Sequence, residues 1–264
     1  MRILLINPPR FNNTPVGRED RCENTIPNVI TPTGLVILAG LLEQKHQVKL
    51  IDANGYDLDI DYIKAEIEKY HPDYVIFKAT PETFYSDVKV ASIAKMTDTK
   101  ILTIMICWSL TKIPEQVLKK ARDVDYYPID YNYERPIHDL CNGKKPEDVK
   151  GCAYRESDCV RVNPPTTELF DFNALPMPAW HLIPDFSVYW VQVPSIRPCV
   201  FVESMKGCGM VCTFCTIAGV PPTFRDAKKV VDEIEYLYKK RRVKYINFFD
   251  ATFNITKLPY SSDQ

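Results

Sequence analysis

The regular alternation of two kinds of segment over about the first 130 residues restricts the possible fold more than any other feature of this chain. Short apolar runs end near positions 6, 52, 77 and 106, and a segment with apolar residues at helical spacing follows each of them. This alternation is typical of βαβ units, whose strands pair in parallel. We therefore predict an α/β fold built on a parallel sheet.

The predicted strands and helices can be placed along the chain from this pattern. We expect strands at residues 2–6, 47–52, 74–77, 100–106 and 125–127. We expect a helix that opens at Pro32-Thr33-Gly34, and further helices at residues 61–70, 85–96 and 113–122. Together they form a Rossmann-like domain over residues 1–140, in which ligands lie beyond the carboxyl ends of the strands. The predicted binding loops are residues 7–10, 52–56, 80–83 and 107–112.

Three cysteines, Cys208, Cys212 and Cys215, follow an apolar run with Cx3Cx2C spacing. Thiolates are the ligands that iron–sulfur clusters favour, and a [4Fe–4S] cluster held by three of them keeps one iron open to a substrate or cofactor. Gly207 and Gly209 allow the backbone to wrap closely around such a cluster. A zinc site is the alternative, but zinc usually takes four ligands in paired sets. No second pair lies nearby in the sequence.

Charge and cysteine usage exclude several other classes of protein. The net charge is -1, with 33 basic and 34 acidic residues mixed throughout, so we predict no nucleic-acid surface. The apolar start at residues 2–6 is too short for a signal peptide or a membrane span. Nine cysteines, an odd number, show no paired spacing outside the cysteine loop. We therefore predict a cytoplasmic protein with reduced thiols and no membrane span.

The remaining chain divides into a linker and a second α/β segment. Residues 141–196 are rich in proline, so we expect them to resist regular structure and to pack across both domains. A helix is predicted at residues 228–240, with its acidic residues towards the amino end and basic residues at the carboxyl end. A strand at residues 243–250 then closes on Asp250.

The cysteine loop resembles the cluster motif of radical S-adenosylmethionine (SAM) enzymes, in which an aromatic residue, here Phe214, precedes the last cysteine. In that family the open iron binds SAM, and one electron cleaves SAM to a 5′-deoxyadenosyl radical. The resemblance implies that Cys208, Cys212 and Cys215 hold the cluster. It also implies that Phe214 and Asp250 lie at the SAM site. For Asp250, a capping role at the strand end is the alternative.

The first domain resembles the cobalamin-binding domain that precedes many radical SAM barrels. Asn7-Pro8-Pro9, Pro32-Thr33-Gly34-Leu35 and Val48-Lys49-Leu50-Ile51-Asp52 match its N-P-P loop, P-x-G-L helix start and V-x-x-I-D strand. The linker patches Gly151-Cys152-Ala153-Tyr154-Arg155 and Leu175-Pro176-Met177-Pro178-Ala179-Trp180 match as well. The resemblance implies cobalamin contacts from Asn7, Pro8, Pro9, Gly34, Asp52, Asn54, Gly55, Thr80, Ser109 and Thr111.

Three stretches depart from the family pattern. The loop Asp52-Ala53-Asn54-Gly55 lacks the cobalt-ligating histidine of cobalamin mutases and methionine synthase. Cys107-Trp108 and Asn132-Tyr133-Glu134 stand where radical SAM relatives often have a Gly-Gly pair and a Gly-Glu-Gly-Glu-like turn. Trp108 is therefore either a wall over the cofactor or the mark of an altered pocket.

The resemblance implies a cobalamin-dependent radical SAM enzyme of methyltransferase type. It would use a [4Fe–4S] cluster, SAM, cobalamin, a small-molecule substrate and an electron donor such as a ferredoxin or flavodoxin. The alternatives are a radical SAM enzyme whose first domain binds no cobalamin, a non-catalytic cofactor-binding remnant, and a zinc-binding interaction module.

The length of the last segment limits what the chain can do alone. A (β/α) barrel needs on the order of 200 residues or more. Only residues 197–264 follow the linker, which is enough for the first βα units of a radical SAM barrel. We therefore expect the chain to be a fragment that does not turn over substrate by itself.

Overall fold

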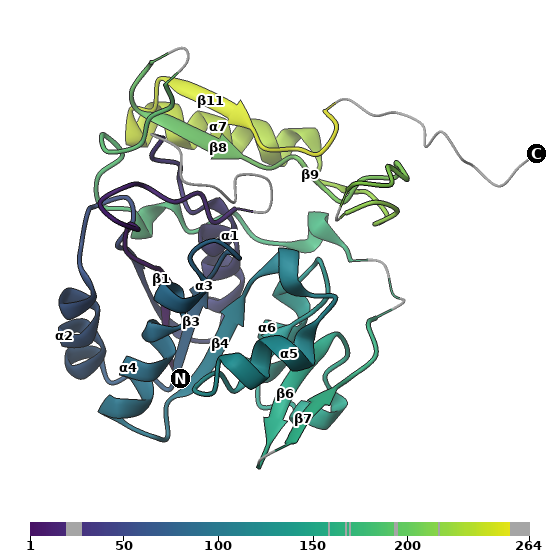
Figure 1. The fold of residues 1–264 in the computed structure, drawn as a ribbon. Coiled ribbons are helices and arrows are strands. Elements are labelled where there is room, and N and C mark those ends of the chain that lie inside the picture. Colours follow the sequence, from purple (N-terminus) through teal and green to yellow (C-terminus); the bar gives the residue numbers. More distant parts are fainter. Residues whose placement is uncertain are drawn as a thin grey trace, which may run out of the picture.

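The computed structural model describes residues 1–19, 28–157, 159–166, 168, 170–192, 195–215 and 217–253. A seven-stranded sheet in the order β2-β1-β3-β4-β5-β6-β7 dominates the first part of the chain (Figure 1). Its strands are β1 (Arg2–Asn7), β2 (Gln47–Asp52), β3 (Tyr74–Lys78), β4 (Leu102–Ile106), β5 (Tyr126–Pro128), β6 (Cys152–Glu156) and β7 (Cys159–Val162). The first five pair in parallel, which confirms the predicted Rossmann-like α/β sheet.

Six helices accompany this sheet within the described residues: α1 (Thr33–Leu42), α2 (Ile60–Tyr70), α3 (Phe84–Asp87), α4 (Lys89–Thr97), α5 (Pro114–Lys120) and α6 (Glu134–Cys141). Helices α1 and α6 bury their apolar residues against one face of the sheet, and α2, α4 and α5 against the other. The described residues also include four 3-10 turns between the longer elements: Trp108–Leu110, Pro146–Asp148, Phe172–Ala174 and Trp180–Leu182.

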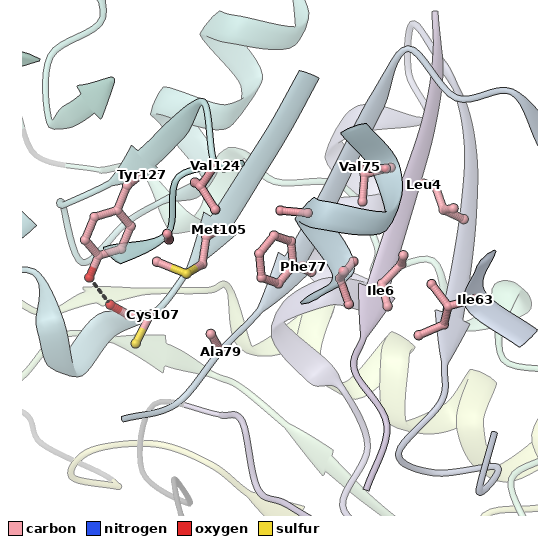
Figure 2. Close-up of a cluster of buried hydrophobic side chains, with 14 of the residues drawn as sticks. Leu4, Ile6, Ile63, Val75, Phe77, Ala79, Met105, Cys107, Val124 and Tyr127 are labelled. Atoms are coloured by element: carbon pink, nitrogen blue, oxygen red, sulfur yellow. Dashed lines mark hydrogen bonds between the residues drawn. The ribbon is translucent and has the colours of Figure 1, made fainter. Parts of the chain in front are cut away.

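The central strands form the core because both of their faces are covered. Every residue of β3 is buried, as expected of a parallel strand between two helical layers. Figure 2 shows one of these layers, in which Leu4 and Ile6 of β1 lie near Phe77 of β3 and Ile63 of α2. The unbroken apolar runs of the sequence are therefore the strands that are covered by helices on both sides.

A smaller α/β unit follows the linker. Strands β8 (Cys199–Val202) and β11 (Tyr245–Phe248) pair in parallel, and α7 (Ala227–Arg241) connects them. Strands β9 (Met205–Lys206) and β10 (Thr223–Phe224) pair antiparallel and flank the cysteine loop. Figure 1 shows β8, β11 and α7 on the side of the large sheet opposite the N-terminus. The carboxyl ends of the parallel strands thus face the second unit.

Two expectations about regular structure were wrong. The proline-rich linker was expected to resist regular structure, but β6 and β7 form an antiparallel extension of the sheet beyond β5. The free edge of β5 offers backbone partners that no local pattern reveals. The expected helix at residues 85–96 is divided at Val88 into α3 and α4.

Helix α6 was not predicted. Its residues Ile137, Leu140 and Cys141 are buried at helical spacing, and Pro136 falls in the first turn, where its missing N–H is not needed. The domain boundaries at 140 and 196 stay predictions. Cys22, one of the nine cysteines, and residues 254–264 of the expected barrel segment lie outside the described residues. No helix in the described part of the chain is long and apolar enough to cross a membrane.

Candidate functional site

The predicted cobalamin contacts at the ends of β1 and β2 bind one another. Asp52 is buried, and its Oδ1 accepts hydrogen bonds from Asn7 Nδ2 at 2.7 Å and from the Gly55 backbone N–H at 2.9 Å. Its Oδ2 accepts from the Tyr189 hydroxyl at 2.7 Å. Burial raises the pKa of Asp52, and these three donors oppose that shift. Asn54 is buried too, and its Oδ1 accepts from the Val16 backbone N–H at 2.8 Å.

The end of β3 is closed by a buried ion pair. Arg18 donates to both carboxylate oxygens of Asp87, at 3.2 and 2.8 Å, and both side chains are 1% exposed. The same guanidinium donates to the carbonyls of Pro8 at 2.9 Å and Pro9 at 2.8 Å. The Thr80 backbone N–H donates to Asp87 at 3.2 Å. Burial raises the pKa of Asp87, while the Arg18 charge lowers it. The predicted contacts Pro8, Pro9 and Thr80 are thus bonded to protein groups.

Gly34 makes room for a second buried ion pair. Lys78 Nζ lies 2.9 Å from Glu19 Oε2, which also accepts from the Gly34 backbone N–H at 3.2 Å. A Cβ at position 34 would lie 2.2 Å from Tyr133 Oη and 2.8 Å from Lys78 Nζ. A side chain at position 34 would therefore crowd the Tyr133 hydroxyl first and this ion pair next.

The carboxyl edge of the sheet also includes the ends of β4 and β5. Beyond these two strands lies a cavity of about 290 Å³. Its walls come from the loop after β4, the loop after β5, the linker and the end of the cysteine loop: Trp108, Lys112, Ile129, Asp130, Tyr131, Asn132, Pro165, Thr166, Glu168, Phe170, Ala218, Gly219, Val220 and Pro221. Trp108 is buried edge-to-face against Tyr131, with ring centroids 4.8 Å apart. Cys208 and Ile217 belong to the same apolar cluster. Trp108 therefore stands between the sheet edge and the cysteine loop.

The predicted contacts Ser109 and Thr111 lie beside this cavity, on the turn that Trp108 begins. Ser109 is half-buried and Thr111 is buried. The Thr111 backbone N–H donates to the Trp108 carbonyl at 3.2 Å. Of the ten predicted cobalamin contacts, these two are therefore the ones that lie next to the apolar cluster of Trp108 and Cys208.

The cysteine loop is closed on itself by backbone hydrogen bonds. The Cys208 N–H donates to the Val220 carbonyl at 2.8 Å, and the Cys215 N–H to the Cys212 carbonyl at 3.1 Å. Gly207 has a φ of 81° and a Cβ there would lie 2.4 Å from the Pro221 carbonyl oxygen, so only glycine fits. Glycine at position 207 is therefore required by the backbone of the loop itself, where residues 207 and 221 meet.

The three thiols of this loop differ in exposure. Cys208 is buried, Cys212 and Cys215 are half-buried, and Cys208 Sγ lies 3.5 Å from Thr252 Oγ1. Among the residues described, no three His, Cys, Asp or Glu side chains already form a group that could hold a metal ion. The donor set nevertheless fits an iron–sulfur cluster in its chemistry, since three thiols share one compact loop.

The two predicted SAM contacts lie in different surroundings. Phe214 is 90% exposed. Asp250 accepts from the backbone N–H groups of Ser204 at 2.7 Å and Met205 at 3.0 Å, and from the Ser204 hydroxyl. Both of its carboxylate oxygens are thus bonded to the turn between β8 and β9. These contacts are those of the alternative role, a cap at the strand end.

Sequence reasoning missed an ion pair next to the cysteine loop. Lys206, two residues before Cys208, contacts Glu134 at the start of α6, and both side chains are buried. The only signal in the sequence was a lysine two residues before the first cysteine of the loop. Its partner could not be identified because it lies 72 positions earlier.

Two curated proteins resemble the sequence over nearly its whole length. An uncharacterized methyltransferase of Pyrococcus horikoshii is 27% identical over 263 residues, which cover 97% of this chain and 55% of the methyltransferase. An anaerobic magnesium-protoporphyrin IX monomethyl ester cyclase of Rubrivivax gelatinosus is 28% identical over 262 residues, which cover 95% of this chain and 45% of the cyclase. The chain thus spans about half the length of these relatives. No protein-family profile matches it.

Two solved structures share the fold. The radical SAM methyltransferase TsrM from Kitasatospora setae, solved with cobalamin and a [4Fe–4S] cluster bound, matches with a TM-score of 0.67 at 15% identity, over 96% of this chain and 48% of TsrM. The cobalamin-dependent SAM radical enzyme OxsB, in its apo form, matches with a TM-score of 0.71 at 19% identity, over 98% of this chain and 34% of OxsB. The fold is that of cobalamin-dependent radical SAM enzymes, which confirms the resemblance drawn from the motifs.

Proposed function

We propose that this chain is the cofactor-binding part of a cobalamin-dependent radical SAM enzyme of methyltransferase type. The observation that carries the proposal is the position of Cys208, whose loop packs on Trp108 and Tyr131 at the carboxyl edge of the Rossmann-like sheet. In sheets of this kind, ligands bind beyond that edge. A cluster held by this loop would therefore lie on the side of the sheet where such ligands bind.

Cys208, Cys212 and Cys215 are the residues proposed to hold the cluster. When bound, a [4Fe–4S] cluster with one open iron supplies the electron that cleaves SAM. The chain's own contribution is to keep water away: Cys208 is buried, and Trp108 and Tyr131 cover it from the side of the sheet. Phe214, exposed on the same loop, is available to contact SAM. Asp250 would shape the SAM site through the turn that it caps.

For cobalamin, we propose that the β4–β5 end of the edge is the contact region, with Trp108 as its wall. Ser109 and Thr111 lie there. The other predicted contacts lie at the β1–β3 end and take part in hydrogen bonds within the protein: Asn7, Pro8, Pro9, Gly34, Asp52, Asn54, Gly55 and Thr80. No described residue that lines the cavity is a histidine. The cavity walls therefore offer cobalt no imidazole.

The rest of the proposal concerns the whole enzyme. We propose a small-molecule substrate, an electron donor such as a ferredoxin or flavodoxin, and the reducing cytoplasm as its compartment. The balanced charge of the chain argues against a nucleic-acid partner. Because this chain spans about half of its relatives, we propose that substrate turnover needs further barrel strands.

Anaerobic reconstitution with iron and sulfide tests the cluster. We expect about four irons per chain, and loss of most of that iron in Cys208→Ala, Cys212→Ala or Cys215→Ala. Cys199→Ala is the matched control, because Cys199 is a buried cysteine on β8 outside the loop. Zinc bound in place of iron and sulfide would contradict the proposal.

Hydroxocobalamin tests the second cofactor on the same reconstituted protein. We expect corrin absorbance to stay with the chain after desalting. A cluster without retained corrin would instead favour a radical SAM enzyme whose first domain binds no cobalamin. The specific observation behind that second candidate is at the β1–β3 end of the edge, where the buried side chains of Asp52, Lys78 and Asp87 already have protein partners.

A further inference from the structure

Lys206 is a charged residue in a position that excludes water. It ends β9, two residues before Cys208, and its side chain is 2% exposed. Its ammonium group forms an ion pair with Oε1 of Glu134, whose side chain is 0% exposed. Glu134 begins α6, which packs on the large sheet, so the pair joins the second unit to the first.

Aromatic rings surround the ammonium group. Lys206 Nζ lies 4.7 Å from the ring centroid of Tyr133, 5.7 Å from that of Phe172 and 6.0 Å from that of Tyr131. Each ring face attracts a cation, most strongly where water is absent. Oε2 of Glu134 is buried and has no hydrogen-bond partner within the described part of the chain. The carboxylate therefore depends on Lys206 for its compensation.

One of these rings, that of Tyr131, reaches the cysteine loop. Tyr131 packs on Trp108 in the apolar cluster that contains Cys208 and Ile217. In the chain, Lys206 is followed by Gly207, where the backbone turns, and then directly by Cys208. Lys206 is thus held by the β5–α6 connection at the point where the chain enters the loop.

From this arrangement we propose that Lys206 is a positioning residue, which fixes the entrance of the cysteine loop through its ion pair with Glu134 and thereby keeps Cys208 against Trp108 and Tyr131. The inference rests on the proposed function, because it gives Lys206 a role in holding a cluster ligand. It also assigns a task to the β5–α6 connection, where the chain has Asn132-Tyr133-Glu134.

The chain offers a matched control. Arg18 and Asp87 form another ion pair, with both side chains 1% exposed, but at the β3 end of the edge and outside the cluster of Cys208. Breaking either pair leaves a buried carboxylate without its cation. Lys206→Met and Arg18→Met should therefore both weaken the fold, and only the first should loosen the cysteine loop.

The test is the alkylation rate of each thiol in the cofactor-free chain under anaerobic conditions, read by peptide mass spectrometry with iodoacetamide as the probe. We expect Lys206→Met to speed the labelling of Cys208 by roughly tenfold, because the loop opens locally. We expect Arg18→Met to change it less than about twofold. Lys206→Arg keeps the charge and a hydrogen-bond donor, so it should protect Cys208 better than Lys206→Met does.

Equal labelling of Cys208 in Lys206→Met and Arg18→Met would overturn the inference. If Lys206→Met does not fold, Glu134→Gln carries the test, because it keeps the shape and a carbonyl acceptor while removing the charge. We then expect an intermediate rise in Cys208 labelling, and wild-type protection in that variant would overturn the inference.

Cluster content separates this inference from the proposed function. If the wild-type chain takes up no iron although Cys208 protection depends on Lys206, the proposed function fails and the positioning role stands. If the wild-type chain binds the cluster and Lys206→Met binds it with an unchanged electron paramagnetic resonance spectrum and unchanged Cys208 protection, the positioning role fails and the proposed function stands.

Discussion

The two ends of the carboxyl edge of the large sheet are built differently. At the β1–β3 end, most polar side chains are buried and bonded to protein groups, as in the pair of Arg18 and Asp87, and within the described residues Asn7 Oδ1 and Asn54 Nδ2 are buried without a partner. At the β4–β5 end, Trp108 and Tyr131 leave a cavity beside the cysteine loop. In sequence both ends offer polar residues after a strand, such as Asn7 and Asp52 at one end and Ser109 and Thr111 at the other. Burial and partners decide which of them can receive a ligand.

The largest expected effect on stability tests the β1–β3 end of the edge, which we call the closed end. Arg18→Met leaves the Asp87 carboxylate buried without its cation, so we expect the free energy of unfolding to fall by about 3–5 kcal/mol. Urea titration followed by circular dichroism measures the change. Arg161→Met is the control, because Arg161 and Glu156 form an exposed pair, and we expect no measurable change. A small effect of Arg18→Met would mean that the closed end contributes little to stability.

Gly34→Ala is expected to have the next largest effect. The new methyl group would meet Tyr133 Oη and Lys78 Nζ, so we expect a loss of about 2–3 kcal/mol from overpacking. Gly143→Ala is the matched control: Gly143 has a φ of 84° with no neighbour near its Cβ position, so only backbone strain of about 1 kcal/mol is expected. Equal losses in the two variants would show that crowding is not the reason for glycine at position 34.

The pH dependence of stability tests the buried carboxyl group of Asp52, at the end of β2. Burial raises the pKa of Asp52, so the folded state holds the proton more tightly than the unfolded state does. This contribution to stability is fully present below the unfolded pKa near 4 and is lost as the pH rises through the folded pKa. Asp52→Asn cannot titrate.

We therefore expect the difference in unfolding free energy, Asp52→Asn minus wild type, to increase with pH above about 4, by up to about 1.4 kcal/mol per pH unit. Urea titrations at several pH values measure it. A difference that stays constant with pH would show that Asp52 titrates normally in the folded protein.

The smallest effect on stability is expected in the cysteine loop, which lies beside the β4–β5 end of the edge. Phe214 is 90% exposed, so Phe214→Ala should change the free energy of unfolding by less than about 0.5 kcal/mol. In the reconstituted protein, the same variant should weaken the change that SAM produces in the electron paramagnetic resonance spectrum of the reduced cluster. A SAM response equal to that of the wild type would remove Phe214 from the proposed SAM site.

The sequence by itself determined the strands of the parallel sheet and the cysteine loop. Strands such as β3 are apolar at every position because helices cover both faces, and that demand is visible within a few residues. The spacing of Cys208, Cys212 and Cys215 is also local, since one short loop supplies all three thiols. Local patterns of this kind can be interpreted without knowledge of the partners.

The tertiary structure alone decided the roles of the polar residues. Gly34, whose role as a cofactor contact stays a prediction, lies where a Cβ would meet Tyr133 Oη and the ion pair of Lys78 with Glu19. Lys206 and Glu134 meet across 72 positions, and β6 pairs with β5 although the linker pattern predicted no strand. A buried charge is tolerated only beside its partner. That partner is brought close by the packing of distant segments, so its identity is not present in any local stretch of sequence.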